Sequence, residues 1–152
     1  MKRQAGLTLV ELLVVLAIVA LATAGTLWSM RQNPQRQLQQ EAQRLSALLE
    51  AARAQAVLQG QVSTWSLDEQ GRFVWRGPVP DDMPTRWEMD PAPRVQWPQG
   101  ARELVLGPEP MIPASRITLE LWRDGQTVAT VVVGTDGLSP ISPLDNAEGS
   151  AK

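Results

Sequence analysis

The chain has 152 residues, which suffices for one domain of ordinary size plus an appendage. It contains no cysteine and no histidine, which excludes disulfide scaffolding, Ser-His-Asp and Cys-His catalysis and almost all zinc chemistry. The formal net charge is -2 and no basic run of five or more residues occurs, so nothing indicates nucleic-acid binding. We therefore expect a non-enzymatic protein with no cofactor, no resident metal and no nucleic-acid partner.

The first predicted element is an apolar helix over residues 7–27. Apolar or small residues fill this range except at four positions, which are Thr8, Glu11, Thr23 and Thr26. A helix of this length extends about 31 Å, the thickness of the hydrocarbon core of a bilayer. Lys2 and Arg3 precede the helix and Trp28 follows it, which predicts a cytoplasmic N-terminus and export of the remaining chain.

Three interpretations of this segment compete. A secretory signal peptide would be cut after the small-residue sequence Ala22-Thr23-Ala24, so that the mature chain would begin at Gly25. A plain one-pass anchor would remain uncut. The third interpretation is a functional membrane segment, because an ionised carboxylate such as Glu11 is costly in hydrocarbon unless another group neutralises it.

Residues 6–18 read GLTLVELLVVLAI and resemble the class III leader junction of type IV pilins and type II secretion pseudopilins. The resemblance implies that prepilin peptidase cuts after Gly6, that Leu7 becomes the methylated N-terminus and that Glu11 supports assembly. The usual first mature residue of the family is phenylalanine, whereas this chain has Leu7. The α-amino group of an incoming subunit would pair with Glu11 of its neighbour, which reduces the cost of burying both charges. Residues 1–6 are then a leader peptide and residues 7–30 a transmembrane helix.

Residues 31–60 are predicted to continue the helix in amphipathic form, with a kink or a new start at Pro34. Six apolar residues recur at alternating spacings of four and three, at Leu38, Ala42, Leu45, Leu49, Ala52 and Ala56. Polar residues such as Glu41 and Arg44 are expected on the other faces, and Gly60 suits the position just after a helix. We expect the apolar stripe to pack on a sheet; a short dimeric coiled coil is the alternative.

Residues 61–142 are predicted to form an antiparallel β-domain of four to seven strands, arranged as two small sheets and connected by proline-rich loops. The candidate strands cover residues 61–67, 72–76, 94–97 and 103–106, followed by a hairpin over residues 116–133. Trp65, Phe73 and Trp75 are expected in the core, because the chain has few other large residues to fill it. The predicted fold class is α+β and pilin-like, with the long helix packed on the β-domain.

The hairpin over residues 116–133 carries the clearest turn signal, Asp124-Gly125. Counting outward from this turn predicts three cross-strand pairs, which are Leu121 with Val128, Leu119 with Thr130 and Ile117 with Val132. This register would place the apolar residues of both strands on one face of the sheet.

The acidic residues of the β-domain give weak site hypotheses. Asp68-Glu69 and Asp81-Asp82 are adjacent pairs in expected turns, so we interpret them as turn residues and assign them no catalysis. A calcium site near the C-terminus is a further alternative, with the candidate ligands Asp136, Asp145, Asn146 and Glu148. Their spacing matches no calcium-loop signature. Residues 143–152 are predicted to be a flexible tail.

The late pattern of a strand, an Asp-Gly turn, a second strand and then Gly134-Thr135-Asp136-Gly137 resembles the GspH/FimT branch of the pilin-like proteins. The resemblance implies a structural minor pseudopilin near the tip of a periplasmic pseudopilus, anchored in the bacterial inner membrane with its C-terminal domain in the periplasm. Its implied partners are prepilin peptidase, the major and other minor pseudopilins and the inner-membrane assembly platform. The alternatives are a minor pilin of type IV pilus biogenesis or DNA uptake and, from another class, a hydrolase using carboxylates.

Overall fold

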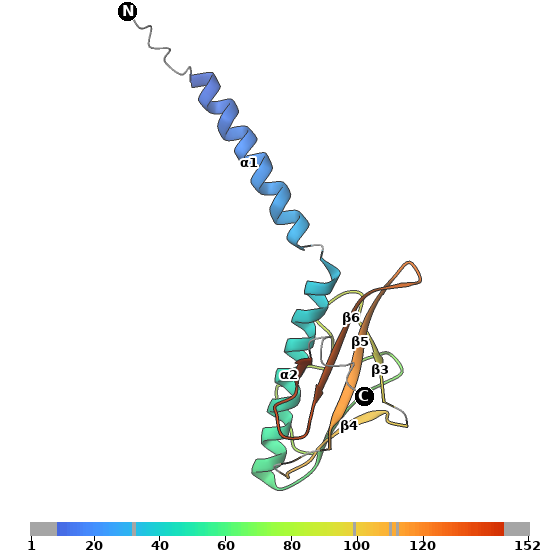
Figure 1. Cartoon of the computed structure of the whole chain (residues 1–152). Helices are drawn as coiled ribbons and strands as arrows, with labels where there is room; N and C mark the ends of the chain where they lie inside the picture. Colours follow the sequence, from blue (N-terminus) through green and yellow to red (C-terminus); the bar gives the residue numbers. More distant parts are fainter. Residues whose placement is uncertain (1–8, 32, 99, 110, 112, 145–152) are drawn as a thin grey trace, which may run out of the picture. The chain divides into compact units, whose positions relative to one another are not determined.

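A computed structural model describes residues 9–31, 33–98, 100–109, 111 and 113–144 (Figure 1). The chain divides into two compact units, one up to Asn33 and one from Pro34 onward. The predicted cleavage junction, Gly6 and Leu7, lies outside the described residues. Three of the four candidate calcium ligands, Asp145, Asn146 and Glu148, also lie outside them.

The first unit contains the helix α1 (Leu9–Arg31), and the second begins with the helix α2 (Pro34–Gln59). Proline is tolerated as the first residue of a helix, where its missing N–H has no helical partner, but it disfavours helical geometry in the residue before it. The chain therefore starts a new helix at Pro34, one of the two outcomes that the sequence predicts there.

The α2 stripe packs inside the domain, as predicted. All six of its residues, Leu38, Ala42, Leu45, Leu49, Ala52 and Ala56, have no exposed surface. Gly60 has φ +61° and ends the helix with two hydrogen bonds, Gly60 N–H to the Val57 carbonyl and Gln61 N–H to the Ala56 carbonyl. Because the stripe faces the sheets of its own chain, packing on a sheet is confirmed over the coiled-coil alternative.

The expected exposure of Glu41 is wrong. Its side chain is 5% exposed, and Oε1 accepts hydrogen bonds from Arg44 Nη1 at 2.7 Å and from the backbone N–H of Glu88 at 3.2 Å. Glu41 precedes the stripe residue Ala42, so it lies at the edge of the buried face, where the segment around Glu88 covers it. A buried carboxylate is tolerated there because both a cation and a backbone donor satisfy it.

Seven strands occur in the described residues and form two antiparallel sheets, which confirms the predicted α+β class. The three-stranded sheet has the order β2-β1-β4, with β1 (Ser63–Leu67), β2 (Phe73–Arg76) and β4 (Glu103–Leu106). The four-stranded sheet has the order β3-β5-β6-β7, with β3 (Arg94–Gln96), β5 (Ser115–Arg123), β6 (Gln126–Thr135) and β7 (Ser142–Leu144). The sequence did not predict β7, and two of its residues lie in the range expected to be a tail.

Trp65 and Phe73 lie in the core, as expected, whereas Trp75 is partly buried and packs against it. Trp65 is completely buried, and its ring lies 5.6 Å from Phe73 and 5.4 Å from Trp97 between centroids. The indole N–H of Trp75 donates to the Pro84 carbonyl at 2.9 Å. The proline-rich connection is therefore held against the sheet by an aromatic side chain of β2.

The predicted register of the β5–β6 hairpin is correct only next to the turn. Asp124 and Gly125 have φ 51° and 78°, the geometry expected for this turn. A register shift between Leu121 and Trp122 then leaves Val128 without an opposing residue. The observed apolar pairs are Leu121 with Ala129, Leu119 with Val131 and Ile117 with Val133.

The physical reason for this correction is a β-bulge. One extra residue on β6, Val128, exchanges the faces of all later residues of that strand. Ala129, Val131 and Val133 consequently enter the core in place of Thr130 and Val132, and Val128 remains 42% exposed. The long hairpin runs beside α2, which covers its buried face (Figure 1).

Candidate functional site

The candidate assembly site is α1, which carries the predicted residue Glu11 in its first turn. The large apolar side chains between Leu9 and Val19 are 50% to 78% exposed within this chain. They occupy successive positions rather than one stripe, so they lie on all faces of the helix. Such a helix cannot bury its apolar surface by itself and must be covered by lipid or by other helices.

Within the described ranges, none of the helices satisfies the length and hydropathy requirements for a membrane span.

The acidic pair Asp68-Glu69 builds a turn, as the sequence analysis interpreted it. Asp68 Oδ1 accepts the backbone N–H groups of Arg72 at 2.8 Å and Gln70 at 2.9 Å, and Oδ2 accepts Arg72 Nε at 2.8 Å. The Arg72 backbone N–H is the main reason why the pKa of Asp68 lies below its ordinary value. A carboxylate held in this way is a turn anchor and not a general base.

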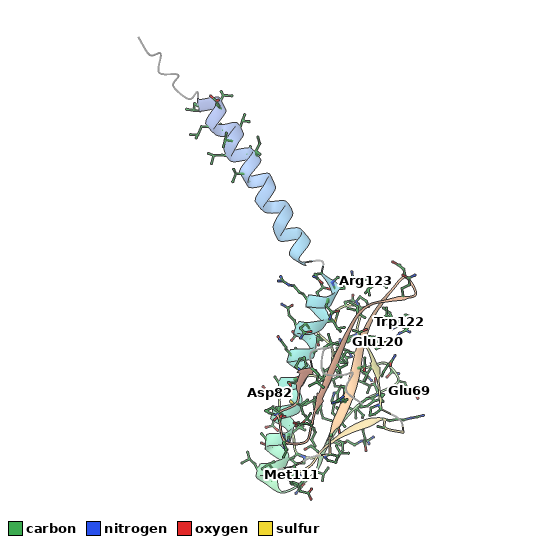
Figure 2. All side chains as sticks on the ribbon, in the orientation of Figure 1. Glu69, Asp82, Met111, Glu120, Trp122 and Arg123 are labelled. Atoms are coloured by element: carbon green, nitrogen blue, oxygen red, sulfur yellow. The ribbon has the colours of Figure 1, made fainter. Side chains whose placement is uncertain are left out.

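Asp68 and Asp81 line one open cleft, but the Asp68 carboxylate is already held by Arg72. Glu69 and Asp82 are both exposed, and Figure 2 shows them on different parts of the domain. Acid–base catalysis by paired carboxylates requires both groups at one reacting atom. The structure therefore supports the interpretation of both pairs as solvated turn residues.

The motif at residues 134–137 closes the end of β6. Asp136 Oδ1 accepts the backbone N–H groups of Ser139 at 2.7 Å and Leu138 at 2.9 Å, and these bonds lower the pKa of its carboxyl group. Thr135 Oγ1 donates to the Ser139 carbonyl at 2.6 Å and accepts the Gly137 N–H at 2.9 Å. The side-chain oxygens of Thr135 and Asp136 therefore form hydrogen bonds with backbone groups of the same turn.

The calcium alternative for Asp136 gains no support from this geometry. In the part of the chain that the structure describes, no three acidic, histidine or cysteine side chains come together as a metal site. The Asp136 carboxylate receives N–H donors, whereas calcium requires several oxygen ligands arranged around one point.

Sequence reasoning missed a polar cluster between α2 and the segment of residues 86–90. Arg44 pairs with Glu41 at 2.7 Å and with Glu88 at 2.9 Å, and its guanidinium also donates to the Arg86 carbonyl at 3.3 Å. Glu41, Arg44 and Glu88 line a shallow cleft together with Gln37, Gln40, Met89 and Asp90. Because both carboxylates share the one guanidinium of Arg44, the cluster fastens the loop to the helix and offers no evident nucleophile or base.

Two family models match the chain. Residues 1–27 match the prokaryotic N-terminal methylation motif, and residues 41–137 match the type II transport protein GspH. The second match covers more than half of the chain. The chain belongs to the GspH family of type II secretion minor pseudopilins. No curated protein and no solved structure gives a significant match.

Membership of this family confirms the predicted class of function. The pseudopilin is a structural, non-enzymatic protein with a prepilin peptidase processing motif. The family implies anchoring in the inner membrane, a periplasmic domain and assembly into a pseudopilus. The individual roles of Gly6, Leu7 and Glu11 stay predictions, because neither match tests single residues.

Proposed function

We propose that this pseudopilin is cleaved between Gly6 and Leu7, methylated on Leu7 and assembled near the tip of the pseudopilus. Residues 7–30 cross the inner membrane once, with the N-terminus in the cytoplasm and the domain from Pro34 onward in the periplasm. The observation that carries this proposal is the contrast between α1, whose apolar side chains are exposed within the chain, and the second unit, which encloses a core of its own.

Glu11 is the proposed assembly residue. After cleavage the positive α-amino group of Leu7 lies four residues before the Glu11 carboxylate. A neighbouring subunit presents the same two charges, so the amine of one chain pairs with the carboxylate of the next in an apolar bundle of helices. This pairing lowers the cost of burying either charge alone.

The proposed partners follow from this role. Prepilin peptidase recognises the residues around Gly6, the assembly platform receives the mature chain, and the major and other minor pseudopilins contact α1 and the periplasmic domain. The resemblance of residues 116–137 to the GspH/FimT branch supports the position near the tip. The domain contributes contact surfaces, since its polar clusters fasten its own loops.

Complementation in a host that lacks this gene but has the remaining secretion system tests the proposal. The wild-type chain should restore secretion of the exported proteins and should be found in pseudopili sheared from the cells. Full secretion without the gene, or a chain found only as a soluble periplasmic protein, would contradict the proposed function.

A further inference from the structure

Several elements of the second unit end together at one end of the domain. Ser63 at the start of β1 pairs with Leu106 at the end of β4, and Ser115 at the start of β5 pairs with Thr135 at the end of β6. Gly60 and Gln61 join the last turn of α2 to β1 at the same place. Loops from three parts of the sequence therefore meet around the C-terminal end of α2.

This end of the domain carries most of its exposed large apolar side chains. Among the described residues of the second unit there are seven such side chains, and five of them lie within these loops and the last turn of α2. The five are Val57, Leu58, Val62, Met111 and Leu138, with exposed fractions of 49%, 80%, 50%, 65% and 74%. Figure 2 shows Met111 at the end of the domain where α2 finishes. We call these five residues the apolar end.

The opposite end of the domain is polar. Gln35 of α2 bonds both backbone groups of Thr130, at 3.1 Å and 3.4 Å, and Arg123 donates to Gln37 at 3.5 Å, which places the β5–β6 turn beside the first turn of α2. The residues exposed at the turn are Arg123, Asp124, Gly125, Gln126, Thr127 and Val128. Val128 is the one large apolar side chain among them, and it supplies a matched control.

We propose that the apolar end is a docking surface for a different subunit of the same pseudopilus, which covers it with an apolar surface of its own. This inference rests on the proposed function. Exposed large apolar side chains that gather at one end of a domain, although the domain already encloses a core, are typical of a protein contact.

A second copy of this chain fits the apolar end poorly. Head-to-tail stacking would place the polar end of one copy on the apolar end of the next. Pairing of two apolar ends would put the two Pro34 residues, from which the N-terminal segments lead away, at opposite ends of the pair. Two chains anchored in one membrane cannot adopt that arrangement.

Strand β7, the last described element, runs away from the apolar end. In β7, Ser142 pairs with Gly134 and Leu144 pairs with Val132, so the strand runs toward the opposite end of β6. Leu144, the last described residue, therefore lies farther along the sheet from the apolar end than Ser142 does.

The small size of the apolar end favours a partner that is already held in the same filament. A stable complex of free proteins uses about 20–30 residues on each side. Five exposed large apolar side chains make up only part of an interface of that size, which suits a contact between subunits that their N-terminal helices already hold together, because the effective concentration is then high.

Site-specific crosslinking tests the proposal directly, because the chain contains no cysteine. Leu58→Cys and the control Val128→Cys would be labelled with a benzophenone maleimide in whole cells that contain the complete secretion system, and then irradiated. Leu58→Cys should give roughly tenfold more adduct than the control, as expected for a desolvated contact, and the attached peptides should come from another pseudopilin. Adducts formed only with a copy of this chain or with lipid, or equal yields at both positions, would overturn the proposal.

Charged variants provide a second test in the full chain. Leu58→Lys and Met111→Lys should lower incorporation into sheared pseudopili roughly tenfold, because the contact would have to desolvate an ammonium group. Val128→Lys should incorporate normally, and all three variants should be processed like the wild type. If the wild type enters pseudopili and the two lysine variants at the apolar end enter equally well, the docking proposal fails and the proposed function stands. If the wild type does not enter pseudopili, both fail.

Discussion

The two helices of this pseudopilin follow one another in the sequence but differ in the exposure of their apolar side chains. The large apolar side chains of α1 from Leu9 to Val19 are at least 50% exposed within the chain, whereas six residues of α2 are completely buried against the two sheets. Burial inside the chain therefore accounts for the stability of the second unit, while the apolar surface of α1 is left for a partner. Substitutions in α1 should impair assembly, and substitutions in the α2 stripe should impair folding.

The largest expected effect tests the assembly role of α1. Glu11→Ala should reduce incorporation into pseudopili roughly a hundredfold, since removing one member of a buried ion pair leaves the other charge unpaired. Cleavage after Gly6 should be unchanged, because the junction itself is intact. Immunoblots of sheared pseudopili and of total membranes measure the two quantities.

Glu69→Ala is the matched control, because Glu69 is an exposed carboxylate in a turn of the β-domain. It should assemble like the wild type. Normal assembly of Glu11→Ala would contradict the proposed charge pairing, and α1 would then act only as an apolar anchor.

The second test contrasts two leucines of α2. Leu45→Ala removes a completely buried side chain and should lower the free energy of unfolding by about 2–5 kcal/mol. Leu58→Ala removes a side chain that is 80% exposed and should change it by less than about 0.5 kcal/mol. Urea unfolding of the full chain in detergent, followed by tryptophan fluorescence, measures both; equal losses would contradict the assignment of the stripe.

A smaller effect is expected at a glycine that links β2 to the proline-rich loop. Gly77 has φ +81°, and a Cβ atom there would collide with the backbone carbonyl oxygen of Val62. Gly77→Ala should cost about 1–3 kcal/mol of unfolding free energy. Gly107→Ala, which meets nothing closer than 3.9 Å, is the control and should be close to neutral. A stable Gly77→Ala variant would mean that β1 and this loop are less tightly joined than the structure shows.

The smallest effect concerns pH. The pKa of Asp136 is lowered below 3.8, mainly by the Ser139 and Leu138 N–H groups, so its ionised form stabilises the fold above that pH. This contribution is lost as the pH falls through the folded-state pKa. Asp136→Asn should therefore lower the urea midpoint slightly at neutral pH, and this difference from the wild type should shrink as the pH falls through the folded-state pKa.

Features set by nearby residues could be predicted from the sequence. The spacing of the α2 stripe, the C-terminal glycine at Gly60 and the Asp124-Gly125 turn each depend on the order of a few residues, and the structure confirms all three. The leader junction around Gly6 and Glu11 could be predicted because it is a compact motif, and the family match to residues 1–27 agrees with it.

Features set by distant residues could not be predicted. The bulge at Val128 places Ala129, Val131 and Val133 of β6 in the core, and a count outward from the turn does not include this packing. Ser142-Pro143-Leu144 has no strand signal, and β7 forms because β6 offers an edge. Glu41 is buried by a loop that lies 47 residues later in the sequence.

Mass spectrometry of the mature N-terminus tests the central claim most directly. The protein would be purified from membranes of a host that contains prepilin peptidase, and its intact mass and N-terminal peptide would be measured. We predict a chain that begins at Leu7 and carries one added methyl group. A chain that begins at Gly25 or at Met1 would contradict the account, because α1 would then be a discarded signal peptide or a plain anchor and not an assembly segment.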